Sequence, residues 1–338
     1  MKAFSSTLAL FASLAVCPLV FAQNEAFTDP VGFVSHTVPA QSDAVLAVPL
    51  YRSPAFRGVI QSISSNVITV AGTPAWTANQ FVQVIGTQND TFAVMIASGA
   101  KEGLTAKITA NGTNTLTVEL DPAESLTGIK SEATDPGAAD QIDIVPYWTP
   151  SSLLGSTVAN GSRLLLFPTN VAGINLSSST TIARTSSGWF IGATNSDHFS
   201  LSFGQSFVFR NQTANPQTVA LVGGVPMVSH RHILRKLSAA GTAQDIRIGF
   251  SSPVPEIIGN LTLGFNPGDR LLVFDNSATG INKSASITLS YTASGWFQGP
   301  TNVTSTFQLQ PGFGYIFRRA STAAPGTVTW SATQSYLQ

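Results

Sequence analysis

The sequence predicts an all-β protein: two tandem β-sandwich-like repeats, with a small β-barrel-like domain inserted in the first repeat. Three observations lead to this prediction. Short stretches that alternate apolar and polar residues, separated by Gly, Asn, Asp or Pro, follow one another nearly throughout the chain. One stretch of about 30 residues occurs twice. A run of hairpin-like segments interrupts the first copy but not the second.

The N-terminal residues 1–22 have the pattern of a secretory signal peptide. Lys2 is the only charge before Glu25, and the apolar run "LALFASLAVCPLVFA" ends at Ala22, too short for a membrane span. We expect cleavage after Ala22, with no transmembrane segment afterwards and export to the periplasm, the outer surface or the extracellular space. Cys17, the only cysteine, lies in this segment, and its lipidation stays open as an alternative.

The first repeat is predicted to be split. The stretch "TVPAQSDAVLAVPLYRSPAF" (37–56) resembles "KLSAAGTAQDIRIGFSSPVPEI" (236–257), which leads directly into "GDRLLVF" in the second copy. In the first copy about 90 residues intervene. The predicted domains are therefore the following: 23–58 with 148–223 as β repeat 1, 59–147 as the inserted small β domain, and 224–338 as β repeat 2.

The inserted stretch contains the strongest hairpin signals. "FRGVIQSISSNVITVAG" is predicted to turn at Ser65-Asn66, "FVQVIGTQNDTFAVMIA" at 88–90, and "LTAKITANGTNTLTVEL" at Asn111-Gly112. Helical periodicity is scarce. Residues 149–155 and 254–260 are each expected to form at most one helical turn, and 229–237 is compatible with a helix or a strand.

The clearest repeat aligns Gly161–Phe190 with Gly268–Phe297 at an offset of 107, with 16 of 30 positions identical and no gap. Both copies end in "SGWF", so Trp189 and Trp296 are each expected to enter a strand just after a tight turn. Their neighbours are typical of a core, which favours burial of both indoles. The alternative is a pair of exposed platforms that stack on sugars.

Several stretches together resemble a known family: "DPVGFVSHTVPAQSDAVLAVPLYRSPAFRGVI", "NVITVAG", "PYWT", "GDRLLVF" and "SGWF". They look like those of an uncharacterised family of exported, paralogous proteins from verrucomicrobial bacteria. The resemblance spans most of the mature chain. It implies export from a Gram-negative cell, and it implies no activity, because the family has no assigned chemistry and no functional residues to carry over.

Composition excludes some classes of function. Charged residues make up 10% of the chain, against roughly 25% in ordinary soluble domains. The formal net charge is zero, with 17 basic and 17 acidic residues, so a nucleic-acid partner is not expected. A net charge near zero weakens mutual repulsion, which favours self-association.

No catalytic constellation appears in the sequence, and no cofactor is expected. His230 and His232 would share one strand face as weak metal candidates, but a metal site needs further ligands. The basic residues Arg231, Arg235 and Lys236 are interpreted as a solvated segment that contacts envelope polysaccharide. The sequence thus predicts an exported, non-enzymatic structural or interaction protein of the cell surface or extracellular matrix. The alternative is a carbohydrate-binding protein that uses Trp189 and Trp296.

Overall fold

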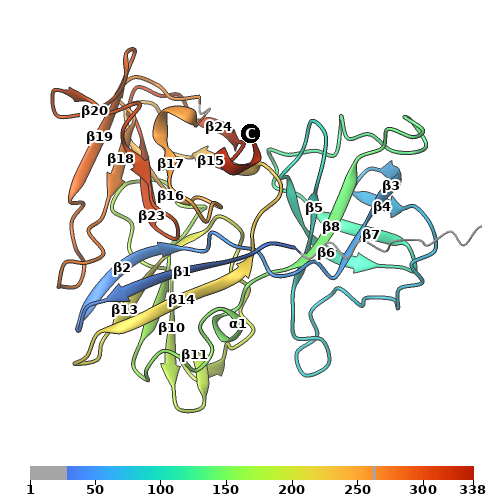
Figure 1. The fold of residues 1–338 in the computed structure, drawn as a ribbon, viewed down its shortest axis with the longest axis horizontal. Helices are drawn as coiled ribbons and strands as arrows, with labels where there is room; N and C mark the ends of the chain where they lie inside the picture. The colour runs from blue at the N-terminus through green and yellow to red at the C-terminus, as the bar shows by residue number, and fades with distance from the viewer. Residues whose placement is uncertain (1–28, 262–263) are drawn as a thin grey trace, which may run out of the picture.

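The structure is a computed structural model that describes residues 29–261 and 264–338. It is all-β, as the sequence predicts, with strands arranged in several sheets and one closed barrel (Figure 1). Its helical elements are α1 (Pro150–Leu154) and two short 3₁₀ helices, η1 (Ile258–Asn260) and η2 (Ser335–Leu337). The predicted signal peptide, residues 1–22, and Cys17 lie outside the described residues.

A closed six-stranded barrel forms the blue, teal and green body on the right of Figure 1, with strand order β3-β4-β7-β6-β5-β8. Its strands are β3 (Phe56–Ser64), β4 (Val67–Val70), β5 (Phe92–Ile96), β6 (Thr105–Asn111), β7 (Thr115–Glu119) and β8 (Gln141–Pro146). Alternate side chains point inward, and Ile60, Ile108 and Ile142 are no more than 1% exposed. The predicted small barrel is confirmed.

Local turns in the barrel follow two of the three predictions. β3 turns into β4 at Ser65, whose φ is 56°, and β6 turns into β7 after Asn111. The predicted hairpin at 88–90 is wrong, because only its second half, β5, is a strand. Side chains of Gln88 and Asn89 accept hydrogen bonds from nearby backbone N–H groups and fold residues 80–90 into successive turns instead.

The first six-stranded sheet has the order β12-β11-β10-β9-β13-β2. Its strands are β2 (Ser42–Ala47), β9 (Arg163–Leu166), β10 (Thr180–Thr185), β11 (Gly188–Ile191), β12 (Thr194–Asn195) and β13 (Ser206–Asn211). β1 (Val31–Val38) pairs with β14 (Gln217–Gly224) as a separate two-stranded sheet. One core lies between these two sheets and contains Trp189 and Phe209.

The second six-stranded sheet has the order β16-β23-β18-β19-β20-β21. Its strands are β16 (Gln244–Gly249), β18 (Arg270–Val273), β19 (Ile287–Thr292), β20 (Gly295–Gln298), β21 (Thr301–Asn302) and β23 (Gly314–Arg319). Two short sheets accompany it, formed by β15 (His230–Lys236) with β24 (Gly326–Ala332) and by β17 (Glu256–Ile257) with β22 (Gln308–Leu309). Their shared core contains Trp296 and Trp330.

The two six-stranded sheets have the same strand order. The strands β9 and β18, which belong to the aligned 30-residue stretches, take the same place in each sheet. The weaker upstream alignment also places β2 and β16 at corresponding edges. In the first sheet the inserted barrel separates the edge strand β2 from the other strands along the sequence, whereas in the second sheet β16 precedes β18 without such an insertion.

Candidate functional site

The two six-stranded sheets pack against each other through the faces of β2, β9 and β13 in the first and of β16, β18 and β23 in the second, and we call this contact the seam. Its apolar part consists of Val45, Leu165 and Val208 from the first sheet and Leu272, Phe274 and Ile316 from the second. None of these side chains is more than 9% exposed. The seam is therefore a further core beside the barrel interior and the two sandwich cores, and it is formed by sheet faces that point away from those sandwich cores.

Two loops cross the seam in opposite directions, and we call residues 167–179 and 274–286 the crossing loops. In the second loop, the backbone N–H of Asn282 donates to Asp43 Oδ2 at 2.7 Å. Arg210 donates to both oxygens of the same carboxylate at 2.7 and 2.9 Å and to Asn282 Oδ1 at 2.6 Å. The edge strand β2 is thereby held by the opposite half of the molecule.

The first crossing loop repeats this arrangement at the other edge strand, β16. The backbone N–H of Asn175 donates to Asp245 Oδ2 at 2.7 Å. Arg318 donates to both Asp245 oxygens at 2.6 and 2.9 Å and to Asn175 Oδ1 at 2.8 Å. The seam therefore has approximate twofold symmetry within one chain.

This symmetry breaks at one position. The outward N–H groups of β2 at Asp43, Val45 and Ala47 donate to Gly280 O, Asn276 Oδ1 and Gly312 O, at 2.8 to 2.9 Å. Asn276 also donates back to Val45 O at 3.0 Å. On β16, Asp245 and Gly249 have the corresponding bonds to Gly173 O and Gly204 O, but no such partner of the Arg247 N–H lies among the described residues.

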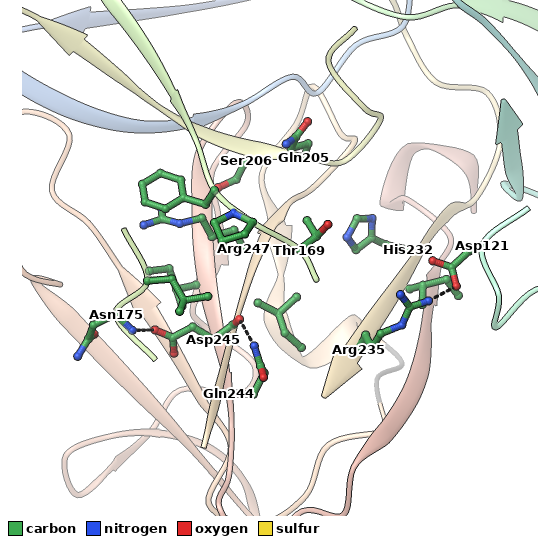
Figure 2. A pocket seen from close by; sticks show the side chains of 16 residues that line it. Asp121, Thr169, Asn175, Gln205, Ser206, His232, Arg235, Gln244, Asp245 and Arg247 are labelled. Atoms are coloured by element: carbon green, nitrogen blue, oxygen red, sulfur yellow. Dashed lines mark hydrogen bonds and ion pairs between the residues drawn. The ribbon is translucent and has the colours of Figure 1, made fainter. Parts of the chain in front are cut away.

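A cavity of about 120 Å³ lies where the symmetry breaks (Figure 2). Thr169, which aligns with Asn276, stands at its rim, and Arg247 takes the place of Val45. The guanidinium carbon of Arg247 lies 3.3 Å from the centroid of the Phe167 ring. Burial lowers the pKa of Arg247 to about 10, and the nearby Asp245 charge raises it, so the side chain remains cationic at neutral pH.

Both predicted histidine candidates lie on β15, and His232 lines this cavity. The two rings stack with centroids 6.2 Å apart, and His230 also packs against Phe250 and Trp330. Burial lowers the pKa of His230 to about 3 and that of His232 to about 4, with Asp121 opposing the shift at His232. Within the described ranges, no group of three or more His, Cys, Asp or Glu side chains is arranged to hold a metal ion.

The predicted solvated basic segment is wrong. Arg231 donates to both carboxylate oxygens of Glu124 at 2.9 and 3.1 Å, and Arg235 pairs with Asp121; both acids belong to the barrel. Lys236 is only 3% exposed and donates to two backbone carbonyls. Arg231 and Arg235 therefore join the barrel to β15, Lys236 bonds to its own chain, and the three cations are engaged within the molecule rather than displayed to a polysaccharide.

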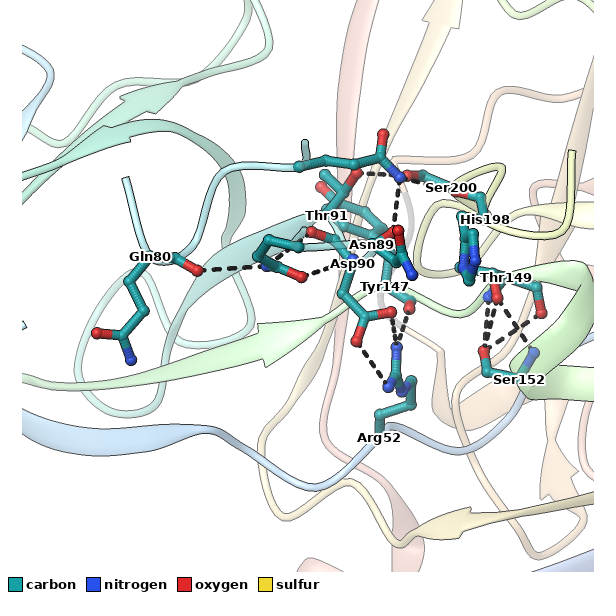
Figure 3. Close-up of polar contacts among 12 residues, drawn as sticks. Arg52, Gln80, Asn89, Asp90, Thr91, Tyr147, Thr149, Ser152, His198 and Ser200 are labelled. Carbon is teal, nitrogen blue, oxygen red and sulfur yellow. Dashed lines mark hydrogen bonds and ion pairs between the residues drawn. The ribbon is translucent and has the colours of Figure 1, made fainter. Parts of the chain in front are cut away.

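A second polar junction joins the barrel to the first sheet (Figure 3). Arg52 donates to the two oxygens of Asp90 at 2.7 and 3.0 Å and to Tyr147 O at 3.0 Å. Ser200 donates to Thr91 Oγ1 at 2.7 Å. Because the inserted barrel is tied to both sheets, it is fixed relative to the seam.

The two predicted sugar-contact residues lie inside the sandwich cores. Trp189 is 0% exposed and Trp296 is 1% exposed, so neither ring offers a face to a ligand. Their backbone N–H groups donate to Asp197 Oδ1 at 2.7 Å and Thr304 Oγ1 at 2.8 Å respectively. In this structure the two repeated tryptophans therefore supply packing.

Exposed apolar side chains gather on the outer face of the β1–β14 sheet, and we call this surface the outer face. Val31 is 74% exposed, Phe33 is 64% exposed, and Val222, directly opposite Phe33, is 50% exposed. An open groove of about 420 Å³ borders it, lined in part by Val31, Trp148 and Val222. The remaining residues of this face are small and uncharged: Ser35, Thr37, Thr218, Ala220 and Gly224.

Sequence reasoning missed both Arg247 and the outer face. The structure, not the weak alignment of 37–56 with 236–257, places Arg247 opposite Val45, because Asp43 and Asp245 lie in register with the equivalent residues Arg210 and Arg318. An arginine opposite an apolar residue marks the point where two otherwise similar edges differ. Nothing in the pattern of β1, however, indicated that Val31 and Phe33 would be exposed among the described residues.

Fold and site together define a class: an all-β protein whose two six-stranded sheets face each other across a seam, with a six-stranded barrel alongside. No protein-family model, curated protein or solved structure matches the chain. Among the helices of residues 29–261 and 264–338, none has both the length and the apolar character that crossing a membrane requires.

Proposed function

We propose that this chain is an exported, non-enzymatic interaction protein that associates with a second copy of itself through the outer face. The observation that carries the proposal is the exposure of Phe33 and Val222 as directly opposed neighbours on one uncharged sheet face. Adjacent exposed apolar side chains of this size are typical of interaction surfaces, whereas scattered single ones are not.

A second copy is the partner that charge favours. The outer face contains no charged residue, and the chain as a whole has a formal net charge of zero. Two copies that meet face to face therefore bring no unpaired like charges together, because Arg52 in the bordering groove is paired with Asp90. A twofold contact is self-complementary, so Phe33 of each copy reaches the groove beside Val222 of the other. Export and the near-neutral surface are compatible with assembly outside the cell.

Sedimentation velocity over a wide range of concentrations tests this proposal. The wild-type chain is expected to associate reversibly, and Phe33→Ser is expected to weaken the association about 30-fold, the loss typical of a central aromatic. Ile85→Ser is the matched control, because Ile85 is 67% exposed but lies on the barrel. A wild-type chain that stays monomeric throughout, or equal effects of the two substitutions, would refute self-association through this face.

A further inference from the structure

The cavity at the seam contains polar atoms without partners. Arg247 Nη1 and Ser206 Oγ are both buried, and neither has a hydrogen-bond partner in the part of the chain that the structure describes. The N–H of Arg247 is also turned outward, because Asp245 and Gly249 on the same edge donate outward and the direction alternates along a strand. A buried donor without an acceptor is costly, so Arg247 Nη1 and Ser206 Oγ, with the outward Arg247 N–H on the same strand edge, indicate a missing acceptor.

The charge balance of the cavity specifies the sign of that acceptor. Asp245 is compensated by Arg318, and Asp121 is paired with Arg235. His232 is neutral at pH 7, because burial lowers its pKa to about 4. Within residues 29–261 and 264–338, Arg247 is the one charge lining the cavity that has no ion pair, so the cavity has one uncompensated positive charge.

The shape and walls of the cavity specify the rest of the ligand. Apolar side chains form much of its surface: Phe167, Leu176, Ile233, Ile246 and Ile316. Its volume is about 120 Å³. A cavity of about 150 Å³ holds benzene, so the space suits a molecule of about six non-hydrogen atoms. The opposite side of the seam needs no ligand, because the Asn276 carboxamide occupies the corresponding edge of β2.

We propose that this cavity binds a small organic carboxylate, with Arg247 and Ser206 donating hydrogen bonds to its oxygens and the apolar wall covering its short chain. The guanidinium is held flat against Phe167, which leaves its N–H edge free for a planar carboxylate. Ligands of this class are the anions of short aliphatic acids, such as butyrate. The site is independent of the outer face, which lies on β1 and β14.

Butyrate and butyramide form the decisive ligand pair, because they match in size and differ in charge. Calorimetric titration and thermal unfolding of the full chain are expected to show binding of butyrate, with a rise in Tm of about 2 °C near saturation. Butyramide is expected to leave Tm unchanged. Equal effects of the two ligands, or no binding of butyrate at constant ionic strength, would overturn the proposal.

Three variants assign the binding to named atoms. Arg247→Met keeps the bulk of the side chain and is expected to abolish butyrate binding. Ser206→Ala removes one buried hydroxyl without changing the shape of the cavity and is expected to weaken binding about tenfold, as expected for one charge-assisted hydrogen bond. Arg270→Met removes an exposed cation on β18 as the matched control and is expected to leave binding unchanged. Should Arg247→Met fail to fold, an unchanged affinity in Ser206→Ala would still contradict the assignment.

Discussion

Single residues explain why the "SGWF" motif occurs twice. Gly188 and Gly295 have φ values of 131° and 110°, a region that favours glycine. A Cβ on either residue would collide with the side chain of Asp197 or Thr304, which holds the following Trp backbone. The sequence indicated correctly that the indoles belong to a core. The sequence could not reveal that Asp197 and Thr304 have equivalent roles in the two copies. They differ in residue type, and they correspond only because each accepts a hydrogen bond from the backbone N–H of its Trp.

Residue-scale electrostatics predict an acid sensitivity. His230 is 2% exposed, and burial lowers its pKa to about 3, from an ordinary value of 6.5. Below pH 6.5 the unfolded chain therefore binds a proton that the folded chain does not, and stability falls as the pH falls toward 3. His230→Phe is expected to remove about 2.5 kcal/mol of the loss between about pH 7.5 and 4.5. Urea unfolding at the two pH values measures this, and an unchanged difference would count against the buried neutral ring.

At the scale of elements, the sequence showed that the two crossing loops resemble each other, but it did not show what they contact. The aligned segments share Gly-Ile-Asn at 173–175 and 280–282, yet the pattern of either segment predicts only a polar loop. The structure shows that each loop binds an edge strand of the opposite sheet, a contact between residues that lie far apart in the sequence. The presence of the strands could be predicted from the local alternation of apolar and polar residues. Which distant loop covers each edge strand could not be predicted in this way.

The crossing loops predict a measurable stability effect. Asn282→Ala removes the acceptor of Arg210 and places alanine at a φ of 52°, which asparagine tolerates better. We expect a loss of about 2 kcal/mol in the free energy of unfolding. Asn170→Ala, at an exposed position in the other crossing loop, is the control and is expected to change stability by less than about 0.5 kcal/mol. Equal losses in both variants would contradict the seam contacts.

At the scale of the whole molecule, the barrel is integrated with both sheets. Glu124 lies in the segment after β7 and is the acceptor for both Lys101 of the barrel and Arg231 of β15. The sequence predicted an inserted barrel from its hairpins. It did not predict that the insertion contacts the second sheet, because the acidic residues of the barrel and the basic residues of β15 are separated by about 100 residues.

This integration predicts how the chain unfolds. The side chains of Glu124 and Arg231 are 7% and 13% exposed, so Glu124→Gln leaves a largely buried cation without its counter-charge. We expect a loss of about 3 kcal/mol and earlier proteolytic release of the barrel. Glu119→Gln, an exposed barrel position, is the matched control. Calorimetry with limited proteolysis provides the measurement, and identical profiles for both variants would mean that the junction contributes no coupling.

The approximate twofold relation across the seam also bears on solubility. Each six-stranded sheet, with its crossing loop, covers the edge strand of the other sheet. A fragment containing only one of the two sheets would therefore expose a row of unpaired strand N–H groups to water. Such rows act as templates on which strands of neighbouring molecules add. Joining both sheets in one chain keeps the two partners at a high local concentration, which protects a polypeptide of zero formal net charge from fibrous aggregation.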